Sequence, residues 1–423
     1  MSAGERRPDR PHYGWVILFM SVVTVLGSLG FGRFGYTMIL PSMKEGLALT
    51  YTQTGLLDTG NFIGYLTLAL VGGFLASRYG PRLVITIFMF LISATMFLTG
   101  LASSFELALL WRTLTGVGSG GTNVPVMGLM SAWFGAKRRG LATGIAVSGS
   151  SFGFLITGFW LPNVTQMPDG WRYSWYYLAG LVFLIAILCF LFLRSRPEEK
   201  GLVAIAADEE PPRPASDKAG SLQWGLVYRS RPVWHLALIY IMFGFSYIIY
   251  ARFFVAYLIS EGGFTEQAAG QLLALAIGFL SIFCGLIWGT VSDLVGRKYG
   301  LAMVYFLQGL CFVTFGLWRS APGYYLSAVL FGLTAWSIPA IMAAACGDYL
   351  GPRLAPAALG FITLFFGIGQ ALGPAVAGRI ADVTGSFSLA FVIAGLAAFV
   401  GSGGSLLLRP PGELGRRNSK PLL

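Results

Sequence analysis

Charged residues are scarce in this sequence. They make up 11% of its 423 residues, whereas 55% are hydrophobic. A soluble globular chain carries about 25% charged residues. This deficit argues against a soluble protein and favours one whose surface faces lipid.

Histidine and cysteine are also rare. The chain has two histidines, and its four cysteines all lie inside apolar runs. The spacings of Cys and His that are typical of metal sites do not occur. A nucleophile–base pair and a phosphate-binding loop are also missing from the sequence. We therefore expect no enzyme activity, no metal and no cofactor.

Long apolar runs recur along the whole chain, and each can cross a hydrocarbon core of ~30 Å as a helix. Glycine is abundant, as in membrane helices that pack closely. The expected fold class is all-α integral membrane, with twelve transmembrane helices. The expected spans are residues 14–40, 53–77, 83–103, 107–132, 140–161, 173–194, 234–259, 268–291, 299–318, 324–347, 356–378 and 386–408.

One long polar segment, residues 195–233, divides the chain into two six-helix halves. The expected organisation is therefore a cytoplasmic N-terminus, an N-terminal bundle, a cytoplasmic linker, a C-terminal bundle and a cytoplasmic C-terminus. These five parts comprise residues 1–13, 14–194, 195–233, 234–408 and 409–423.

Most lysines and arginines fall at the chain ends, in the linker and in the loops on the linker's side of the membrane. Arg82, Lys137 and Arg297 are examples from the loops. An excess of basic residues on one side marks the cytoplasmic face, which explains the net charge of +11 better than nucleic-acid binding does. We expect a multi-pass protein of the plasma (inner) membrane, with both termini cytoplasmic. We expect it to be a monomer whose partner is the lipid bilayer.

The two halves carry an internal repeat. The run Gly73–Arg82 follows the second expected span, and a similar run, Gly289–Lys298, follows the eighth. The offset between the two runs also separates Gly144 from Gly360. Two halves related in this way predict two pseudo-symmetric bundles with the substrate bound between them.

These motifs resemble those of the major facilitator superfamily. The Gly-x-x-x-Asp-x-x-Gly-Arg-Lys run at 289–298 is similar to its cytoplasmic loop motif, and the run at 73–82 differs from it in having Ser77 at the acidic position. Arg112 and the glycines that follow it are similar to the motif of the fourth helix. The resemblance implies a transporter fold.

A narrower resemblance, running nearly end to end, is to the monocarboxylate transporters and their oxalate/formate-type relatives. It rests on Tyr13-Gly14-Trp15, Gly170-Trp171-Arg172 and Leu372-Gly373-Pro374. It implies that Arg33 occupies a position linked to substrate. The Asp and Arg common in the eighth helix of that family are missing from residues 268–288, and Arg252 is the candidate replacement.

Four charged residues fall well inside the expected spans, where each costs about 2.5–3.5 kcal/mol and so needs a partner or a function. They are Arg33, Asp58, Arg112 and Arg252. We expect Arg33 and Arg252 to bind a carboxylate from opposite halves, because a guanidinium donates two parallel hydrogen bonds to it. Snorkelling toward the membrane surface is the alternative for both arginines.

Asp58 is the expected proton carrier, and a fixed ion pair with Arg33 or Arg112 is the alternative. Arg112 is assigned to the coupling machinery, through a structural or gating contact. The other expected substrate-binding residues are Tyr36, Asn123 and Gln370.

The loop motif is expected to act as a gate. Asp293, at the end of the eighth span, can pair with Arg297, and Gly289 opens the motif. Such a latch would close the cytoplasmic side.

The expected function is secondary active transport of a small organic anion, a monocarboxylate, by alternating access and proton symport. Three alternatives remain open: anion exchange without protons, proton-coupled efflux of an apolar compound, and a receptor that no longer transports. The excess of intramembrane arginines argues against a cationic substrate.

Overall fold

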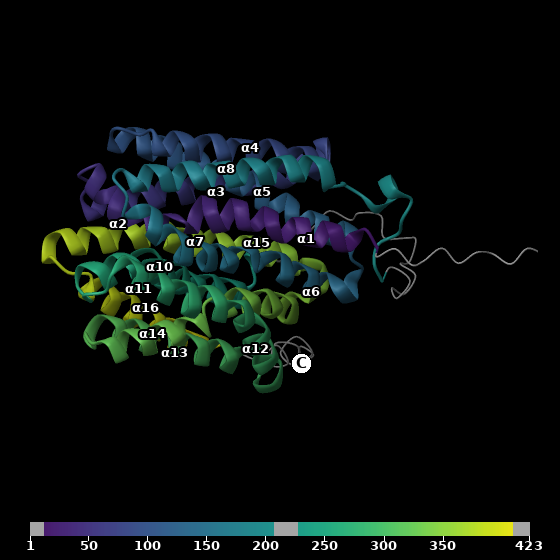
Figure 1. Ribbon diagram of the computed structural model, residues 1–423. Coiled ribbons are helices and arrows are strands. Elements are labelled where there is room, and N and C mark those ends of the chain that lie inside the picture. The colour runs from purple at the N-terminus through teal and green to yellow at the C-terminus, as the bar shows by residue number, and fades with distance from the viewer. Residues whose placement is uncertain (1–11, 207–226, 409–423) are drawn as a thin grey trace, which may run out of the picture.

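The computed structural model describes residues 12–206 and 227–408, and nearly all of these residues are helical (Figure 1). One isolated bridge, between Phe134 and Ile205, is the only strand-type pairing in these ranges. The expected terminal segments and much of the expected linker lie outside the described residues.

The first half of the chain forms helices up to Phe192, and two of its long helices begin at side-chain caps. Thr50 and Gln53 form a capping box at the start of α3, and Ser104 accepts from the backbone N–H of Leu107 at the start of α5. The elements are α1 (Gly14–Val25), the π-helix η1 (Leu26–Phe34), α2 (Tyr36–Gly46), α3 (Tyr51–Tyr79), α4 (Pro81–Gly100), α5 (Phe105–Trp133), α6 (Ala136–Val147), α7 (Gly149–Thr165) and α8 (Gly170–Phe192).

A short 3-10 helix, η2 (Pro197–Lys200), follows the first half. The helix α15 bends at Gly351, whose φ of 76° is not helical. The elements of the second half are α10 (Arg231–Ser260), α11 (Glu266–Leu272), the π-helix η4 (Leu273–Phe279), α12 (Leu280–Val295), α13 (Arg297–Leu317), α14 (Ala321–Gly332), α15 (Ser337–Thr384) and α16 (Ser388–Leu406).

The repeated motif forms the same turn in both halves. Gly80 links α3 to α4 with a φ of 85°, and Gly296 links α12 to α13 with a φ of 93°. Positive φ values favour glycine because it lacks a Cβ. The internal repeat seen in the sequence is therefore a structural repeat as well.

Ten helical stretches of the described residues are long and apolar enough to cross a membrane, or eleven if the bent helix α3 is counted. The helix α5 has 29 residues, and its Glu106 and Arg112 lower its apolar character. With α5 included, the helical stretches follow the order of the expected spans. The predicted all-α membrane architecture is confirmed.

The two halves form two bundles that lie side by side, purple to teal for the first and green to yellow for the second (Figure 1). They meet where α3 packs on α15, α7 on η4 and α11, and α2 on α10. We call the end at which α8 ends and α10 begins the linker end, and the opposite end the far end. Large apolar side chains such as Leu286 and Leu294 cover the outside of the bundles, as expected for contact with lipid.

Candidate functional site

Four charged side chains are buried in the middle of the molecule, three of them in contacts between the two bundles and Arg112 inside the first. Asp58, Arg112 and Arg252 are 0% exposed, and Arg33 is 5% exposed. They are the only charged residues buried in the described part of the chain, and they leave two positive charges in excess. An excess of buried charge is costly, so the cluster is suited to receiving an anion.

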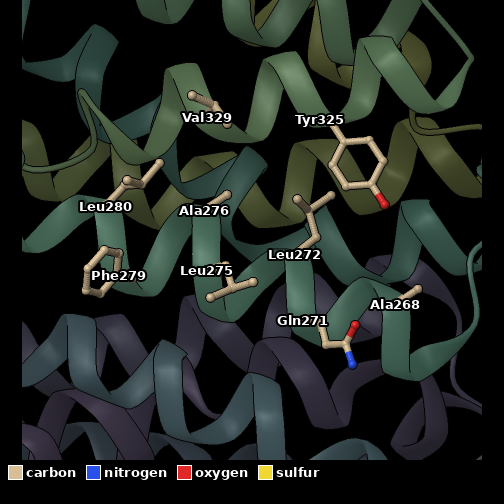
Figure 2. Close-up of a pocket in the computed structure, with 9 residues that line it drawn as sticks. All are labelled: Ala268, Gln271, Leu272, Leu275, Ala276, Phe279, Leu280, Tyr325 and Val329. Atoms are coloured by element: carbon tan, nitrogen blue, oxygen red, sulfur yellow. The ribbon is translucent and has the colours of Figure 1, made fainter.

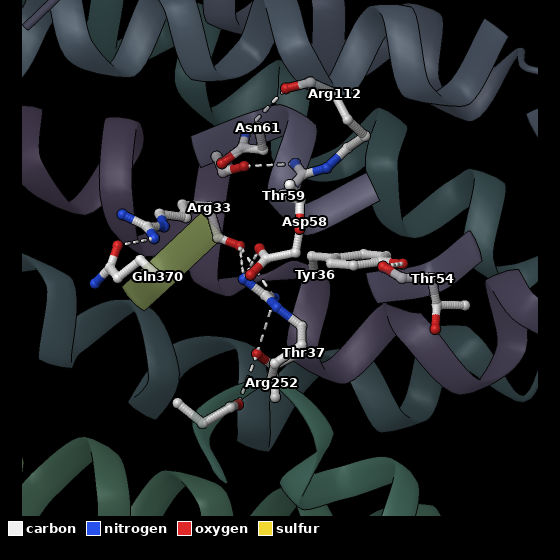
Figure 3. Close-up of polar contacts among 12 residues, drawn as sticks. Arg33, Tyr36, Thr37, Thr54, Asp58, Thr59, Asn61, Arg112, Arg252 and Gln370 are labelled. Carbon is white, nitrogen blue, oxygen red and sulfur yellow. Dashed lines mark hydrogen bonds and ion pairs between the residues drawn. The ribbon is translucent and has the colours of Figure 1, made fainter. Parts of the chain in front are cut away.

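Asp58 of α3 forms an ion pair with Arg252 of α10, and this pair joins the two bundles (Figure 3). The expected alternative, a pair of Asp58 with Arg33 or Arg112, is therefore wrong. Arg252 also donates to Thr37 Oγ1 at 3.1 Å and to the backbone carbonyl of Arg33 at 3.4 Å. One oxygen of Asp58, Oδ2, has no hydrogen-bond partner.

Arg33, in the last turn of η1, also reaches across the interface. Its Nη2 donates to Gln370 Oε1 of α15 at 2.6 Å, and Gln370 in turn donates to the hydroxyl of Tyr247. Nε of Arg33 is buried without a partner. Arg33 thus meets an uncharged amide, and within the described residues its positive charge has no counter-ion.

Arg112 is held inside the first bundle. Its Nη1 donates to the carbonyl of Gly32 at 2.6 Å, and its guanidinium lies 4.9 Å from the ring centroid of Trp175. The ring of Tyr36 lies 5.0 Å from the guanidinium carbons of both Arg112 and Arg252. Tyr36 therefore separates two like charges by an aromatic ring, which attracts cations.

Asn123 lies on α5 and donates to the hydroxyl of Tyr65 at 2.9 Å. Its Oδ1 is buried without a partner. Asn123 is connected to the cluster through Tyr65, whose ring centroid lies 5.8 Å from the guanidinium carbon of Arg33. All five residues expected to bind substrate thus lie at or beside the interface.

The far end of the interface is closed by backbone contacts. Asp382 accepts hydrogen bonds from the backbone N–H groups of Tyr51 at 2.8 Å and Thr52 at 2.7 Å, at the start of α3. A carboxylate is stabilised at a helix N-terminus. A Cβ on Gly378 would lie 2.2 Å from the carbonyl oxygen of Tyr51, so the two helices touch there.

A second close approach joins α7 to α11. A Cβ on Gly158 would lie 2.4 Å from the carbonyl oxygen of Gly270. Two hydrogen bonds also join the bundles here. Nearer the far end, Thr165 donates to Glu266, with a length of 2.7 Å; nearer the middle, Ser281 donates to Ser151, with a length of 2.9 Å.

The bundles part toward the linker end. Among the described residues, no inter-bundle hydrogen bond lies closer to the linker end than the contact of Ser151 with Ser281 and Trp336. Gly144 of α6 and Gly360 of α15 have no atoms within 4 Å of an added Cβ. We therefore call the far end closed, and we call the linker end, where no described hydrogen bond joins the bundles, open.

The loop motif lies at the linker end. Arg297 pairs with Asp293 and also with Asp348 of α15, whose Oδ2 lies 2.8 Å from Nε. Gly289 lies one helical turn before Asp293, and its backbone carbonyl accepts a hydrogen bond from the Ser292 hydroxyl. In the first half, Ser77 supplies no carboxylate and Arg82 donates to the carbonyl of Phe190 instead. Asp348 was not anticipated from the sequence, because the motif does not include α15.

An apolar groove of about 480 Å³ lies between η4 and α14 (Figure 2). Leu275, Phe279 and Tyr325 line it and are about half exposed. The groove contains no charged residue, so it is suited to lipid chains and not to an anion.

Sequence reasoning missed Phe62, which lies 4.6 Å from the guanidinium carbon of Arg33. Its position four residues after Asp58 on α3 was the available signal, since residues i and i+4 share a helix face. Groups of His, Cys, Asp or Glu that could hold a metal were not found in the described residues.

Residues 25–406 match a family described as "Uncharacterised MFS-type transporter YbfB". The chain is 26% identical over 411 residues to the hexuronate transporter of Bacillus subtilis (strain 168), covering 93% of this chain and 94% of that protein. It is 26% identical over 409 residues to monocarboxylate transporter 13 of Rattus norvegicus, covering 94% and 89%.

The fold is similar to that of a bacterial homolog of the human lysosomal transporter Spinster, solved in an inward-facing and unoccupied conformation. The TM-score is 0.78 at 16% identity, and the match covers 95% of this chain and 98% of that chain. The predicted transporter fold is confirmed, and monocarboxylate transporters are among the relatives of the chain.

Proposed function

The chain belongs to the major facilitator superfamily, and from this membership we propose that it transports a small organic anion, a monocarboxylate, by alternating access with a proton as co-substrate. The observation that carries the proposal is the Arg33 side chain. It lies between the bundles, bonds to the uncharged Gln370 and keeps its charge unbalanced. A carboxylate would supply the missing counter-ion through charge-assisted hydrogen bonds.

The orientation proposed here has the linker end in the cytoplasm. Basic residues such as Arg82, Arg138 and Arg297 lie at that end, in agreement with the positive-inside rule. The described arrangement, closed at the far end, is then the inward-facing one. The proposal also includes a plasma-membrane location and a monomeric state.

Proton coupling follows from the ion pair between the bundles. Opening the far end requires α3 and α10 to separate, and breaking a buried pair leaves two uncompensated charges. A proton on Asp58 removes its charge and releases Arg252. The substrate carboxylate then takes the place of Asp58 beside Arg252, so proton and anion enter the cycle together.

Anion exchange without protons is the second candidate, because Asp58 and Arg252 are both 0% exposed in their pair. If the pair persists throughout the cycle, Arg33 alone binds the anion and no proton is required.

The test is uptake of radiolabelled lactate and pyruvate into proteoliposomes under an imposed pH gradient. Wild type is expected to show gradient-driven uptake, and Arg33→Ala to lose it by roughly 10- to 100-fold, the value of a hydrogen bond between charged groups. Arg138→Ala removes an exposed arginine and serves as the matched control. Uptake that Arg33→Ala leaves unchanged contradicts the proposal.

A companion variant separates symport from exchange. Asp58→Asn is expected to abolish the response to the pH gradient while anion counterflow persists. Wild-type anion counterflow whose rate does not depend on the pH gradient would favour anion exchange without protons.

A further inference from the structure

We propose that the site selects carboxylates with an aromatic or branched apolar body over polyhydroxylated sugar acids. This inference rests on the proposed function and names its substrate class. It begins from the surroundings of Arg33, the one buried arginine of the described residues that keeps some exposure.

Aromatic rings of the first bundle surround the Arg33 guanidinium. The ring centroids of Phe62, Phe34 and Tyr65 lie 4.6, 5.5 and 5.8 Å from its Cζ. These rings attract the guanidinium through their faces. They also offer apolar surface to whatever binds beside it.

Aromatic rings of the second bundle extend this group of rings. Trp336 lies 5.7 Å from Phe34 and 5.9 Å from Tyr247, measured between ring centroids. Phe366 stacks on Tyr247 at 5.9 Å. Rings from both bundles therefore flank the bond between Arg33 and Gln370.

Three side chains near Arg33 already donate to protein partners, and Asn123 Oδ1 is among the few buried groups that stay free to pair with a substrate hydroxyl. Asn123 donates to Tyr65, Gln370 donates to Tyr247, and Trp336 Nε1 donates to Ser151 at 3.1 Å. A sugar acid brings several hydroxyls, and each hydroxyl buried without a partner weakens binding. Burial of an apolar substrate body instead strengthens binding, because it removes apolar surface from water.

Trp336 is the ring best placed to select the substrate body. It precedes α15 in the second bundle, is only partly buried, and is tied by its indole N–H to Ser151 of the first bundle. This hydrogen bond holds the indole ring of Trp336 between the two bundles.

The experiment measures uptake of radiolabelled phenylacetate, pyruvate and glucuronate into proteoliposomes containing the full chain. Phenylacetate is expected to enter at least tenfold more efficiently, as kcat/KM, than glucuronate. Trp336→Ala is expected to reduce this preference about tenfold, while Trp318→Ala, a half-exposed tryptophan at the far end, leaves it unchanged.

The outcomes separate the two proposals. Arg33-dependent uptake that favours glucuronate overturns the inference and leaves organic-anion transport standing. Failure of all three acids to enter overturns both. The wild-type ranking decides the inference even if Trp336→Ala does not fold.

Discussion

The two ends of the bundle interface use glycine in opposite ways. At the far end, Gly378 of α15 lets the backbone of α3 approach until a Cβ would lie 2.2 Å from a carbonyl oxygen. At the linker end of the same helix, Gly360 has nothing within 4 Å of an added Cβ. Gly378 packs directly against the backbone of α3, whereas Gly360 faces open space.

Under the proposed alternating access, this difference indicates which surfaces move. In alternating access, a contact made at one end must be released when the other end closes. Gly360 and its repeat partner Gly144 are free in the described arrangement. They are therefore candidates for the close approach in the opposite arrangement, as Gly378 is in this one.

The largest effect is expected at the buried ion pair between Asp58 and Arg252. Asp58→Ala or Arg252→Ala each leaves a buried charge without its partner, so each should lower the free energy of unfolding by about 3–5 kcal/mol. The double variant Asp58→Ala/Arg252→Ala should recover most of this loss. Denaturant unfolding in detergent measures all three, and additive losses in the double variant would contradict the pairing.

A smaller effect is expected from the glycines. Gly378→Ala forces α15 away from Tyr51, and overpacking of this kind costs about 1–3 kcal/mol. The amides of Tyr51 and Thr52, protected by Asp382, should then exchange hydrogen roughly tenfold faster. Gly360→Ala is the matched control on the same helix and should leave that exchange unchanged. Equal hydrogen-exchange rates of these amides in the two variants would contradict the proposed difference between the far end and the linker end.

The smallest effect is expected at the loop motif. Asp293 is 61% exposed and Arg297 keeps Asp348 as a partner, so Asp293→Asn should change stability by less than about 0.5 kcal/mol. We expect it to favour the linker-open arrangement by about twofold, because the Asp293 carboxylate, still 61% exposed here, would gain further partners when that end closes. Maleimide labelling of a cysteine at the exposed Ser131 measures this. Asp169→Asn, an exposed acid at the far end, is the control, and an unchanged labelling rate would argue against the latch.

Much of this architecture could be predicted from the sequence, because hydrophobic length and motif spacing are local properties. The expected spans already place Arg33, Asp58, Arg112 and Arg252 well inside the membrane. The structure brings these four residues together in one buried cluster.

The pairing within the cluster could not be predicted in this way. Depth does not fix which way a helix face points, so it does not identify Arg252 as the partner of Asp58. The contact of Asp382 with α3 likewise depends on how the two bundles pack. Under the proposed alternating access, contacts between the bundles would also change during transport, while a single sequence encodes every arrangement.

If the proposed alternating access moves the buried cluster relative to the membrane field, its two unbalanced positive charges make the empty transporter sensitive to voltage. A potential of 100 mV is worth about 2.3 kcal/mol for each charge that crosses the whole membrane. With the linker end in the cytoplasm, a negative-inside potential draws the cluster toward the arrangement described here. In the proposed symport, one proton and one monoanion would leave the charge of the cluster unchanged, so the same potential would set the resting orientation without driving net accumulation.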